Sequence, residues 1–193
     1  YLIHFCMGSL TVAGWKRFLG ILPLVFFGFH FYESWMLGQE GNLLWACHVS
    51  GLLLGLGFLL DNKMLTQVSS LWIVIGFPLW IIDLAYTDLW LVSSFFSHIG
   101  NFTLCLYGIY LVGARKNAWV YASFYFFICQ GLARVFTDPK LNVNVSHRVY
   151  VGMDAVFSSY WEQWLVILIS VPVVLWIVNR SLSIVSSKIS LSD

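Results

Sequence analysis

Cys47 and His98 are the two side chains whose chemistry and predicted depth most directly suggest a reaction. They lie in the apolar runs at residues 42–60 and 89–112. At about 1.5 Å of rise per helical residue, Cys47 lies roughly 8 Å below the outer end of its run, and His98 lies roughly 6 Å deeper. Side chains can bridge that difference. A thiol beside an imidazole is the minimal nucleophile and general base for acyl transfer, because the imidazole takes the thiol proton.

Other interpretations of the cysteines and histidines stay open. A buried cysteine is usually a small hydrophobic residue, which is how we interpret the three cysteines other than Cys47. His48 follows Cys47 directly and should point about 100° away around a helix, so the two should not face one substrate equally. No cofactor is firmly indicated. Haem or a metal is the alternative, with His30 and His48 as its ligands, because two histidines on facing helices can be axial ligands.

Further polar side chains gather toward the same ends of the apolar runs. Ionisable groups are costly in hydrocarbon and usually face a bundle interior or a wet cavity. We therefore expect a polar chamber that opens toward the outer leaflet. Asp83 or Asn101 would orient the imidazole of His98, although Asp83 can instead simply pair with Arg134. The residues expected to hold a lipid or its polar head group are Asn101, Gln130, Arg134, Asn144 and His147.

The composition is that of an integral membrane protein. Of the 193 residues, 60% are hydrophobic and only 10% are charged, and the mean hydropathy is +0.82. Soluble chains carry about 25% charged residues, so too little polar surface is present to cover a water-soluble globule. The formal charge of +1 provides no basic field for a nucleic-acid backbone. The expected partners are membrane lipids and, in the alternative below, other membrane subunits.

The apolar runs predict an all-α, polytopic transmembrane bundle in one domain, residues 1–193. A run long enough to cross the hydrocarbon as a helix needs roughly 20 residues. Short connections make consecutive helices antiparallel neighbours. An outer loop at 137–156 is too polar to span and is long enough to fold over the bundle. The six full spans are predicted at 19–37, 42–60, 65–86, 89–112, 118–136 and 157–178, with an uncertain, short first span at 1–14.

The distribution of basic residues predicts the orientation. Lysines and arginines are concentrated in cytoplasmic loops of membrane proteins. They are enriched on the side of the bundle that holds residues 16–17, Lys63, residues 115–116 and the C-terminal segment. We therefore expect a cytoplasmic C-terminus.

Three stretches and a loop resemble the bacterial YwaF-like family of small integral membrane proteins, which is grouped at a distance with animal membrane acyltransferases. The stretches are N-L-L-W-A-C-H-V-S-G-L-L-L at 42–54, L-W-I-V-I-G-F-P-L-W-I-I-D-L at 71–84 and S-F-F-S-H-I-G at 94–100, with N-V-N at 142–144. The chain departs from the family pattern at Trp45 and Ile99. The resemblance implies a helical bundle in a bacterial inner membrane, with Cys47 and His98 as the candidate catalytic pair.

Two functions are expected from these residues. The first is lipid acyl transfer or ester or thioester cleavage, with Cys47 as nucleophile, His98 as base and Asp83 beside them. The second is a non-catalytic subunit or scaffold of a larger membrane complex, binding lipid, pigment or haem through its many aromatic side chains. A transporter is less favoured, because no discontinuous helix pair or inverted repeat is visible.

Overall fold

The computed structural model describes residues 12–85, 91–113 and 115–189, and this part of the chain is helical, without strands. The all-α prediction is confirmed. The short first span predicted at 1–14 lies, apart from residues 12–14, outside the described residues. The elements are α1 (Val12–Leu19), α2 (Ile21–Met36), η1 (Glu40–Leu44), α3 (Ala46–Leu59), α4 (Lys63–Asp83), α5 (Val92–Phe95), η2 (Phe96–Gly100), α6 (Asn101–Val112), α7 (Ala118–Phe136), η3 (Val143–Val145) and α8 (Tyr160–Ile189).

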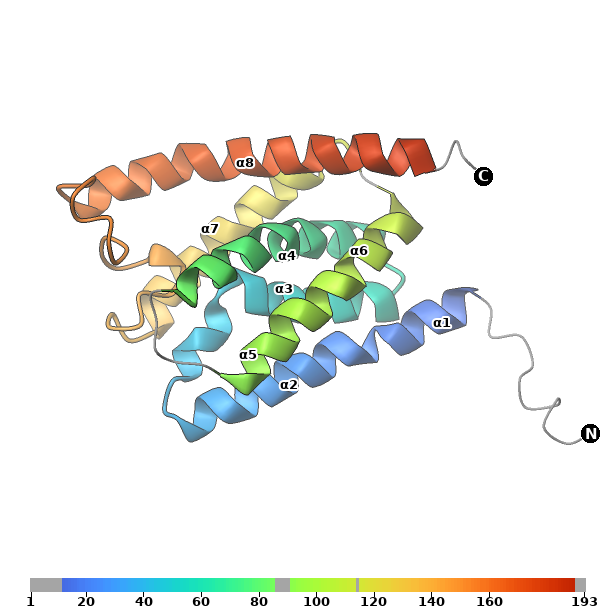
Figure 1. The fold of residues 1–193 in the computed structure, drawn as a ribbon, viewed down its shortest axis with the longest axis horizontal. Helices are drawn as coiled ribbons and strands as arrows, with labels where there is room; N and C mark the ends of the chain where they lie inside the picture. Colours follow the sequence, from blue (N-terminus) through green and yellow to red (C-terminus); the bar gives the residue numbers. More distant parts are fainter. Residues whose placement is uncertain (1–11, 86–90, 114, 190–193) are drawn as a thin grey trace, which may run out of the picture.

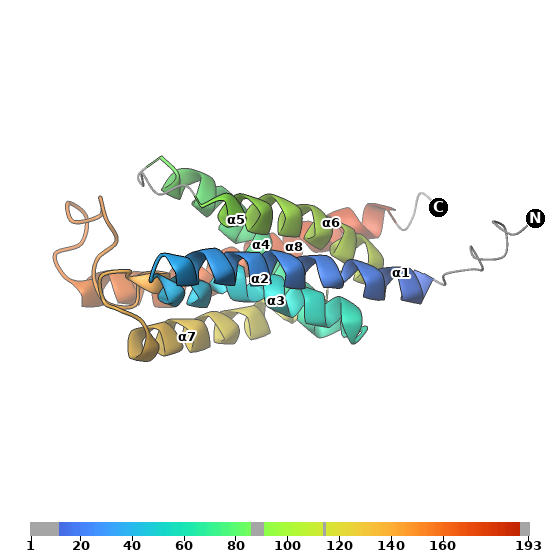
Figure 2. The ribbon, with the colours of Figure 1, turned by 90° about the horizontal axis from the view of Figure 1, so that it is seen from below.

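The long helices form an antiparallel bundle (Figure 1). The helices α1 and α2 follow each other along one rod, and α5, η2 and α6 form another. Both views show α3 and α4 inside the bundle, while α8 runs along one edge of it (Figure 1, Figure 2). The turn between α2 and α3 lies at the same end as the loop between α7 and α8. The loop at 137–156, called the long loop below, therefore lies over the end of the bundle where α3 begins (Figure 1).

Among the described residues, four helices are long and apolar enough to cross a membrane, which indicates an integral membrane protein. They are Arg17–Met36, Lys63–Asp83, Val92–Val112 and Tyr160–Ser186. The prediction for 42–60 differs from the structure, because α3 has only 14 residues. Such a helix is roughly 21 Å long, which is less than the hydrocarbon thickness of about 30 Å. The first four residues of the predicted run belong to η1 or are Trp45, whose backbone is extended (φ −56°, ψ 132°).

The bounds of the remaining helices follow the hydropathy pattern closely. The helix α7 begins and ends where the run at 118–136 does. The helix α8 continues to Ile189, well past the predicted end at 178, so the serine-rich segment after 180 extends the helix. Serine side chains there donate to carbonyls one turn earlier, as Ser183 does to Asn179 (2.8 Å). These bonds satisfy the hydroxyls within the helix.

Aromatic stacking and close backbone contacts hold the interior together. Trp72 on α4 stacks on Phe126 of α7 with 4.7 Å between ring centroids, and its indole N–H donates to the carbonyl of Ala122 (2.8 Å). A Cβ added to Gly55 would lie only 2.8 Å from the carbonyl oxygen of Gly20. The glycine-rich run of α3 therefore allows neighbouring helices to approach closely.

Candidate functional site

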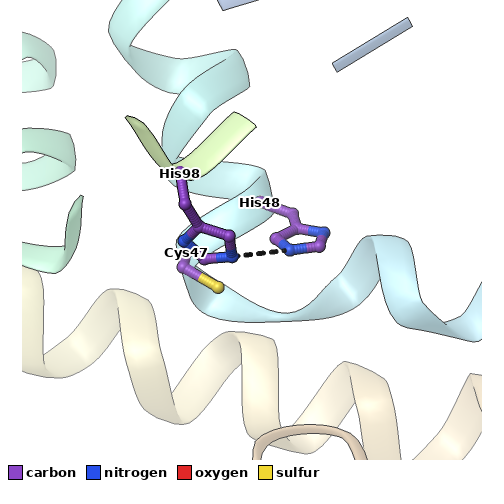
Figure 3. A group of neighbouring side chains, drawn as sticks. All are labelled: Cys47, His48 and His98. Carbon is purple, nitrogen blue, oxygen red and sulfur yellow. Dashed lines mark hydrogen bonds between the residues drawn. The ribbon is translucent and has the colours of Figure 1, made fainter. Parts of the chain in front are cut away.

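Cys47, His48 and His98 meet inside the bundle. One donor atom from each, the cysteine sulfur and an imidazole nitrogen from each histidine, lies within 4.8 Å of the other two. The Nε2 atoms of the two histidines are 3.3 Å apart, so one of them donates a hydrogen bond to the other. Figure 3 shows the sulfur beside these two facing nitrogens. A thiol and two imidazoles therefore share one small space.

The start of α3 is held by residues far away in the sequence. Asn144, from the long loop, accepts from the backbone N–H of Ala46 through Oδ1 (2.9 Å) and donates through Nδ2 to the carbonyl of Leu44 (2.7 Å). Tyr125 of α7 donates its hydroxyl proton to the carbonyl of Ala46 (2.8 Å). Cys47 thus lies in the first turn of a helix whose position is fixed from two sides. The positive end of a helix dipole favours negative charge nearby.

Two residues of α4 lie directly against Cys47 and His98. A Cβ added to Gly76 would lie 2.8 Å from Cβ of Cys47, so only glycine leaves room for the cysteine in this position. Trp80, one turn further on, stacks on the His98 ring with 4.7 Å between centroids and 13° between planes. His98 lies in η2, a π-helical turn at Phe96–Gly100. Such π turns occur frequently at functional sites.

Cys47, His48 and His98 form a cluster, and a third histidine, His30, extends this cluster toward α5. The His30 ring packs edge to face against His48, with 4.0 Å between ring centroids. His30 Nδ1 lies 2.8 Å from the hydroxyl of Ser93, and the backbone N–H of Ser93 donates to Glu33 Oε2 (2.8 Å). The two histidines considered as metal ligands from the sequence are thus neighbours. Through Ser93, the hydrogen-bond network extends from His30 to the carboxylate of Glu33.

The three imidazoles are withdrawn from the surface. His30 is 1% exposed, His98 6% and His48 7%, while Cys47 is half-buried. Two ring nitrogens, His30 Nε2 and His48 Nδ1, are buried without a hydrogen-bond partner in the described residues. Leaving a buried polar atom unpaired costs about 1–3 kcal/mol. Such a cost is tolerated most readily at sites where the polar groups serve a ligand or a reaction.

The two groups expected to orient the His98 imidazole lie in different surroundings. Asp83, at the end of α4, accepts a hydrogen bond from the hydroxyl of Tyr150 in the loop at 137–156 (2.7 Å). Asn101 is buried one turn after His98, and its carboxamide lies against Gly51 of α3. Its Oδ1 has no hydrogen-bond partner among the described residues. Asn101 therefore lies beside the cluster, and Asp83 contacts the loop while lying close enough to Cys47 for an electrostatic interaction.

Gln130 and Asn144, expected to bind a head group, bind the protein itself. Gln130 donates through Nε2 to the carbonyl of Asn144 (3.0 Å) and accepts from the indole N–H of Trp164 (3.2 Å). Both polar atoms of the Asn144 side chain bond to the backbone around the start of α3. These side chains join the loop to α3, α7 and α8, so their contacts are structural.

Arg134 and His147 lie at the same junction. The Arg134 guanidinium donates to the carbonyl of Ser146 and lies over the rings of Tyr160 (5.1 Å) and Trp161 (5.7 Å). Its side chain is exposed beside a groove of about 300 Å³ between α7 and α8. His147 donates its backbone N–H to Asn142 (3.0 Å), and its ring Nε2 is buried.

The expectation that Cys47 and His48 point in different directions is wrong for their donor atoms. The 100° step between successive helical residues applies to the Cβ direction. The imidazole is long enough to bring its Nε2 back toward His98 and the sulfur. Sequence reasoning also missed Gly76, Trp80 and Ser93. Their contacts depend on how separate helices pack, and neither hydropathy nor spacing indicates them.

The cluster suits two kinds of chemistry, nucleophilic attack by the thiol and coordination of a small metal ion. It does not suit haem between His48 and His98. Two axial bonds of roughly 2 Å each would separate the ligating nitrogens by about 4 Å. The 3.3 Å between these Nε2 atoms is too short for that arrangement.

The chain matches no protein-family model, no curated protein and no solved structure. The resemblance to the YwaF-like family therefore stays a prediction.

Proposed function

We propose that this protein is a membrane enzyme that transfers or hydrolyses acyl groups, with Cys47 as nucleophile and His98 as general base. The observation that carries the proposal is the meeting of the Cys47 sulfur with the imidazole nitrogens of His48 and His98 inside an apolar bundle. A thiol in hydrocarbon surroundings has little tendency to ionise by itself. An imidazole in reach removes that obstacle by accepting the proton.

In the first half-reaction, the thiol proton moves to the His98 imidazole and the sulfur attacks the acyl carbonyl carbon of an ester or thioester. The resulting tetrahedral intermediate expels the alcohol or thiol, which receives the proton from the imidazolium. The product is an acyl group in thioester linkage to Cys47. In the resting state one Nε2 of the histidine pair donates to the other.

In the second half-reaction, the hydroxyl of an acceptor lipid or of water gives its proton to His98 and attacks the thioester carbonyl. The bond between the carbonyl carbon and sulfur breaks, and the proton returns to the Cys47 sulfur. Overall, the acyl group moves from an oxygen or sulfur of the donor to an oxygen of the acceptor, without any change of oxidation state. His48 and Trp80 keep the base in place, one through the 3.3 Å contact and the other by stacking.

The membrane placement is part of the proposal. We infer that α3 and α7 complete six crossings together with the four long apolar helices. The cluster then lies toward the outer leaflet, and the C-terminus lies in the cytoplasm of a bacterial cell. The helices α4 and α7 begin, and α8 ends, at the end of the bundle opposite to the loop at 137–156 (Figure 1). Lys63 begins α4, Arg115 and Lys116 directly precede α7, and Arg180 lies in the last third of α8, so these basic residues support this orientation.

Membrane lipids are the proposed substrates and surroundings. Arg134 is the best candidate for contact with an anionic head group. Its guanidinium has five N–H donors, of which the bond to Ser146 uses one, and its side chain is exposed. The aromatic rings of Tyr160 and Trp161 beside it are of the kind that lies at the membrane interface.

The test is the effect of Cys47→Ala and His98→Ala on turnover of a p-nitrophenyl ester of a medium-chain fatty acid. Each substitution should abolish turnover while the protein still inserts into the membrane and purifies as a folded species. Cys105→Ala is the matched control, because Cys105 is a buried cysteine that donates to its own helix (3.1 Å). If Cys47→Ala is silent and deletion of the protein instead removes a partner complex, the chain is a non-catalytic membrane subunit.

A further inference from the structure

The spacing of the His48 and His98 nitrogens fits the edge of a zinc coordination tetrahedron. Zinc binds imidazole nitrogen at about 2.0–2.1 Å, so two such ligands in a tetrahedron are separated by roughly 3.3–3.4 Å. The two Nε2 atoms are 3.3 Å apart. The histidine pair therefore needs almost no movement to bind the ion.

Cys47 supplies the third donor. Its sulfur lies within 4.8 Å of the histidine donor atoms. With a zinc–sulfur bond of about 2.3 Å, the sulfur–nitrogen edges of a tetrahedron are roughly 3.6 Å. A shift of about 1 Å in the cysteine rotamer and the first turn of α3 closes that difference. The combination of imidazole and thiolate excludes Mg²⁺ and Ca²⁺, which prefer oxygen ligands.

We propose that Cys47, His48 and His98 bind a Zn²⁺ ion, with a fourth position open to water, and that the zinc-bound state is catalytically silent. The inhibition rests on the acyl-transfer function proposed above, whereas the binding does not. On binding, the Cys47 thiol loses its proton to solvent and the sulfur becomes a metal ligand. The same electron pair then no longer attacks an acyl carbonyl.

The surroundings support a bound cation. The His30 ring packs edge to face against His48 and restrains its orientation, as groups around metal ligands do. Through Ser93, His30 is connected to the carboxylate of Glu33. The Cys47 thiolate and the Glu33 carboxylate together would match the two charges of the ion. Charge balance of this kind matters because an unpaired charge is costly in an apolar bundle.

The binding is tested with Co²⁺, which occupies zinc sites and gives visible spectra. The full chain is purified in detergent, stripped with a chelator and titrated with Co²⁺. We expect visible bands of a tetrahedral ion and a near-ultraviolet sulfur-to-cobalt band, both abolished by added Zn²⁺. Cys47→Ser should lose the near-ultraviolet band, and His48→Ala and His98→Ala should each weaken Co²⁺ binding by about tenfold or more. Cys105→Ser is the matched control and should keep all bands.

The absence of the near-ultraviolet band in folded wild-type protein, or its persistence in Cys47→Ser, overturns the zinc site. The inhibition is tested separately by acylation of Cys47 with the p-nitrophenyl ester, before and after loading with Zn²⁺. We expect loading to reduce the acylation rate by at least tenfold, and an unchanged rate with zinc bound overturns the inhibition. Cobalt bands in a protein that never acylates Cys47 would reject the enzyme and leave the metal site standing. Acylation of Cys47 without cobalt bands would reject the metal site and leave the enzyme standing.

Discussion

The Nε2 atoms of His48 and His98 lie 3.3 Å apart, although 50 residues separate them in the chain. The contact joins the first turn of α3 to the π-helical turn η2. Neither imidazole can change its orientation without changing the environment of the other and of the Cys47 sulfur beside them (Figure 3). Residues that fix the positions of these two turns relative to each other should therefore control the reactivity of Cys47, even if they take no part in the acyl transfer.

Gly76 is the first such residue. An added Cβ at this position would lie 2.8 Å from Cβ of Cys47, so Gly76→Ala must displace the cysteine or the start of α3. We expect an overpacking cost of about 1–3 kcal/mol in the free energy of unfolding, and a clear fall in the rate of Cys47 acylation. Gly131→Ala is the matched control on α7, because nothing lies within 4 Å of its added Cβ. Equal acylation rates in the two variants would contradict the proposed packing of Cys47.

Asn144 is predicted to act on Cys47 through the start of α3. Asn144→Gly removes its bonds to Ala46 and Leu44 but keeps a residue that tolerates the φ of +52° found there. We expect a loss of about 1–3 kcal/mol in unfolding free energy, together with slower acylation of Cys47. Both are measured in detergent by thermal unfolding and by mass spectrometry.

Asn62 provides the matched control for Asn144. It caps α4 by accepting from the backbone N–H groups of Met64 and Leu65, at the other end of the bundle. Asn62→Ala should lower the free energy of unfolding by about 0.5–2 kcal/mol without slowing acylation. If both variants slow acylation in proportion to their loss of stability, Asn144 has no specific effect on the site.

Ser93 should stabilise the cluster through His30. Ser93→Ala removes the hydroxyl that lies 2.8 Å from His30 Nδ1 and leaves a second ring nitrogen of that histidine unpaired. We expect a cost of about 1–3 kcal/mol in unfolding free energy. Ser123→Ala, which removes a buried hydroxyl bonded within its own helix to Trp119 (2.8 Å), should cost less than about 1 kcal/mol. A larger effect of Ser123→Ala would show that the His30 contact contributes little.

Arg134 is predicted to affect substrate binding without affecting chemistry. Arg134→Gln should raise KM for a donor with an anionic lipid head group by about tenfold or more, because a hydrogen bond to a charged group contributes about 1.5–3 kcal/mol. It should leave turnover of the neutral p-nitrophenyl ester unchanged. Arg148→Gln is the control, since Arg148 donates to the carbonyl of Lys140 within the loop (2.9 Å). A parallel loss on both substrates would indicate a purely structural role for Arg134.

Much of the helical framework is readable from hydropathy. The bounds of α7 agree with the apolar run at 118–136, because that run is bordered by polar residues on both sides. The run at 42–60 was assigned a full span, but its first residues form η1 instead. Hydropathy could not predict this, because the start of α3 depends on a cap from Asn144, 98 residues beyond Ala46.

The candidate site was predictable only in outline. Depth estimates from helical rise bring Cys47 and His98 to similar levels, and the structure brings their donor atoms within 4.8 Å. Depth alone does not say which faces of the helices meet. Gln130 and Arg134 lie at a comparable level, yet their hydrogen bonds join the loop at 137–156 to α7. Backbone carbonyls of a folded loop are acceptors that a sequence does not locate.

The most direct test of the acyl-transfer account is the mass of the Cys47 peptide after the purified protein reacts with the p-nitrophenyl ester. The account predicts one added acyl group on Cys47 in the wild type, none on this peptide in folded Cys47→Ala and a strongly reduced amount in folded His98→Ala. An unmodified Cys47 in active wild-type protein, or undiminished turnover in Cys47→Ala, would contradict it.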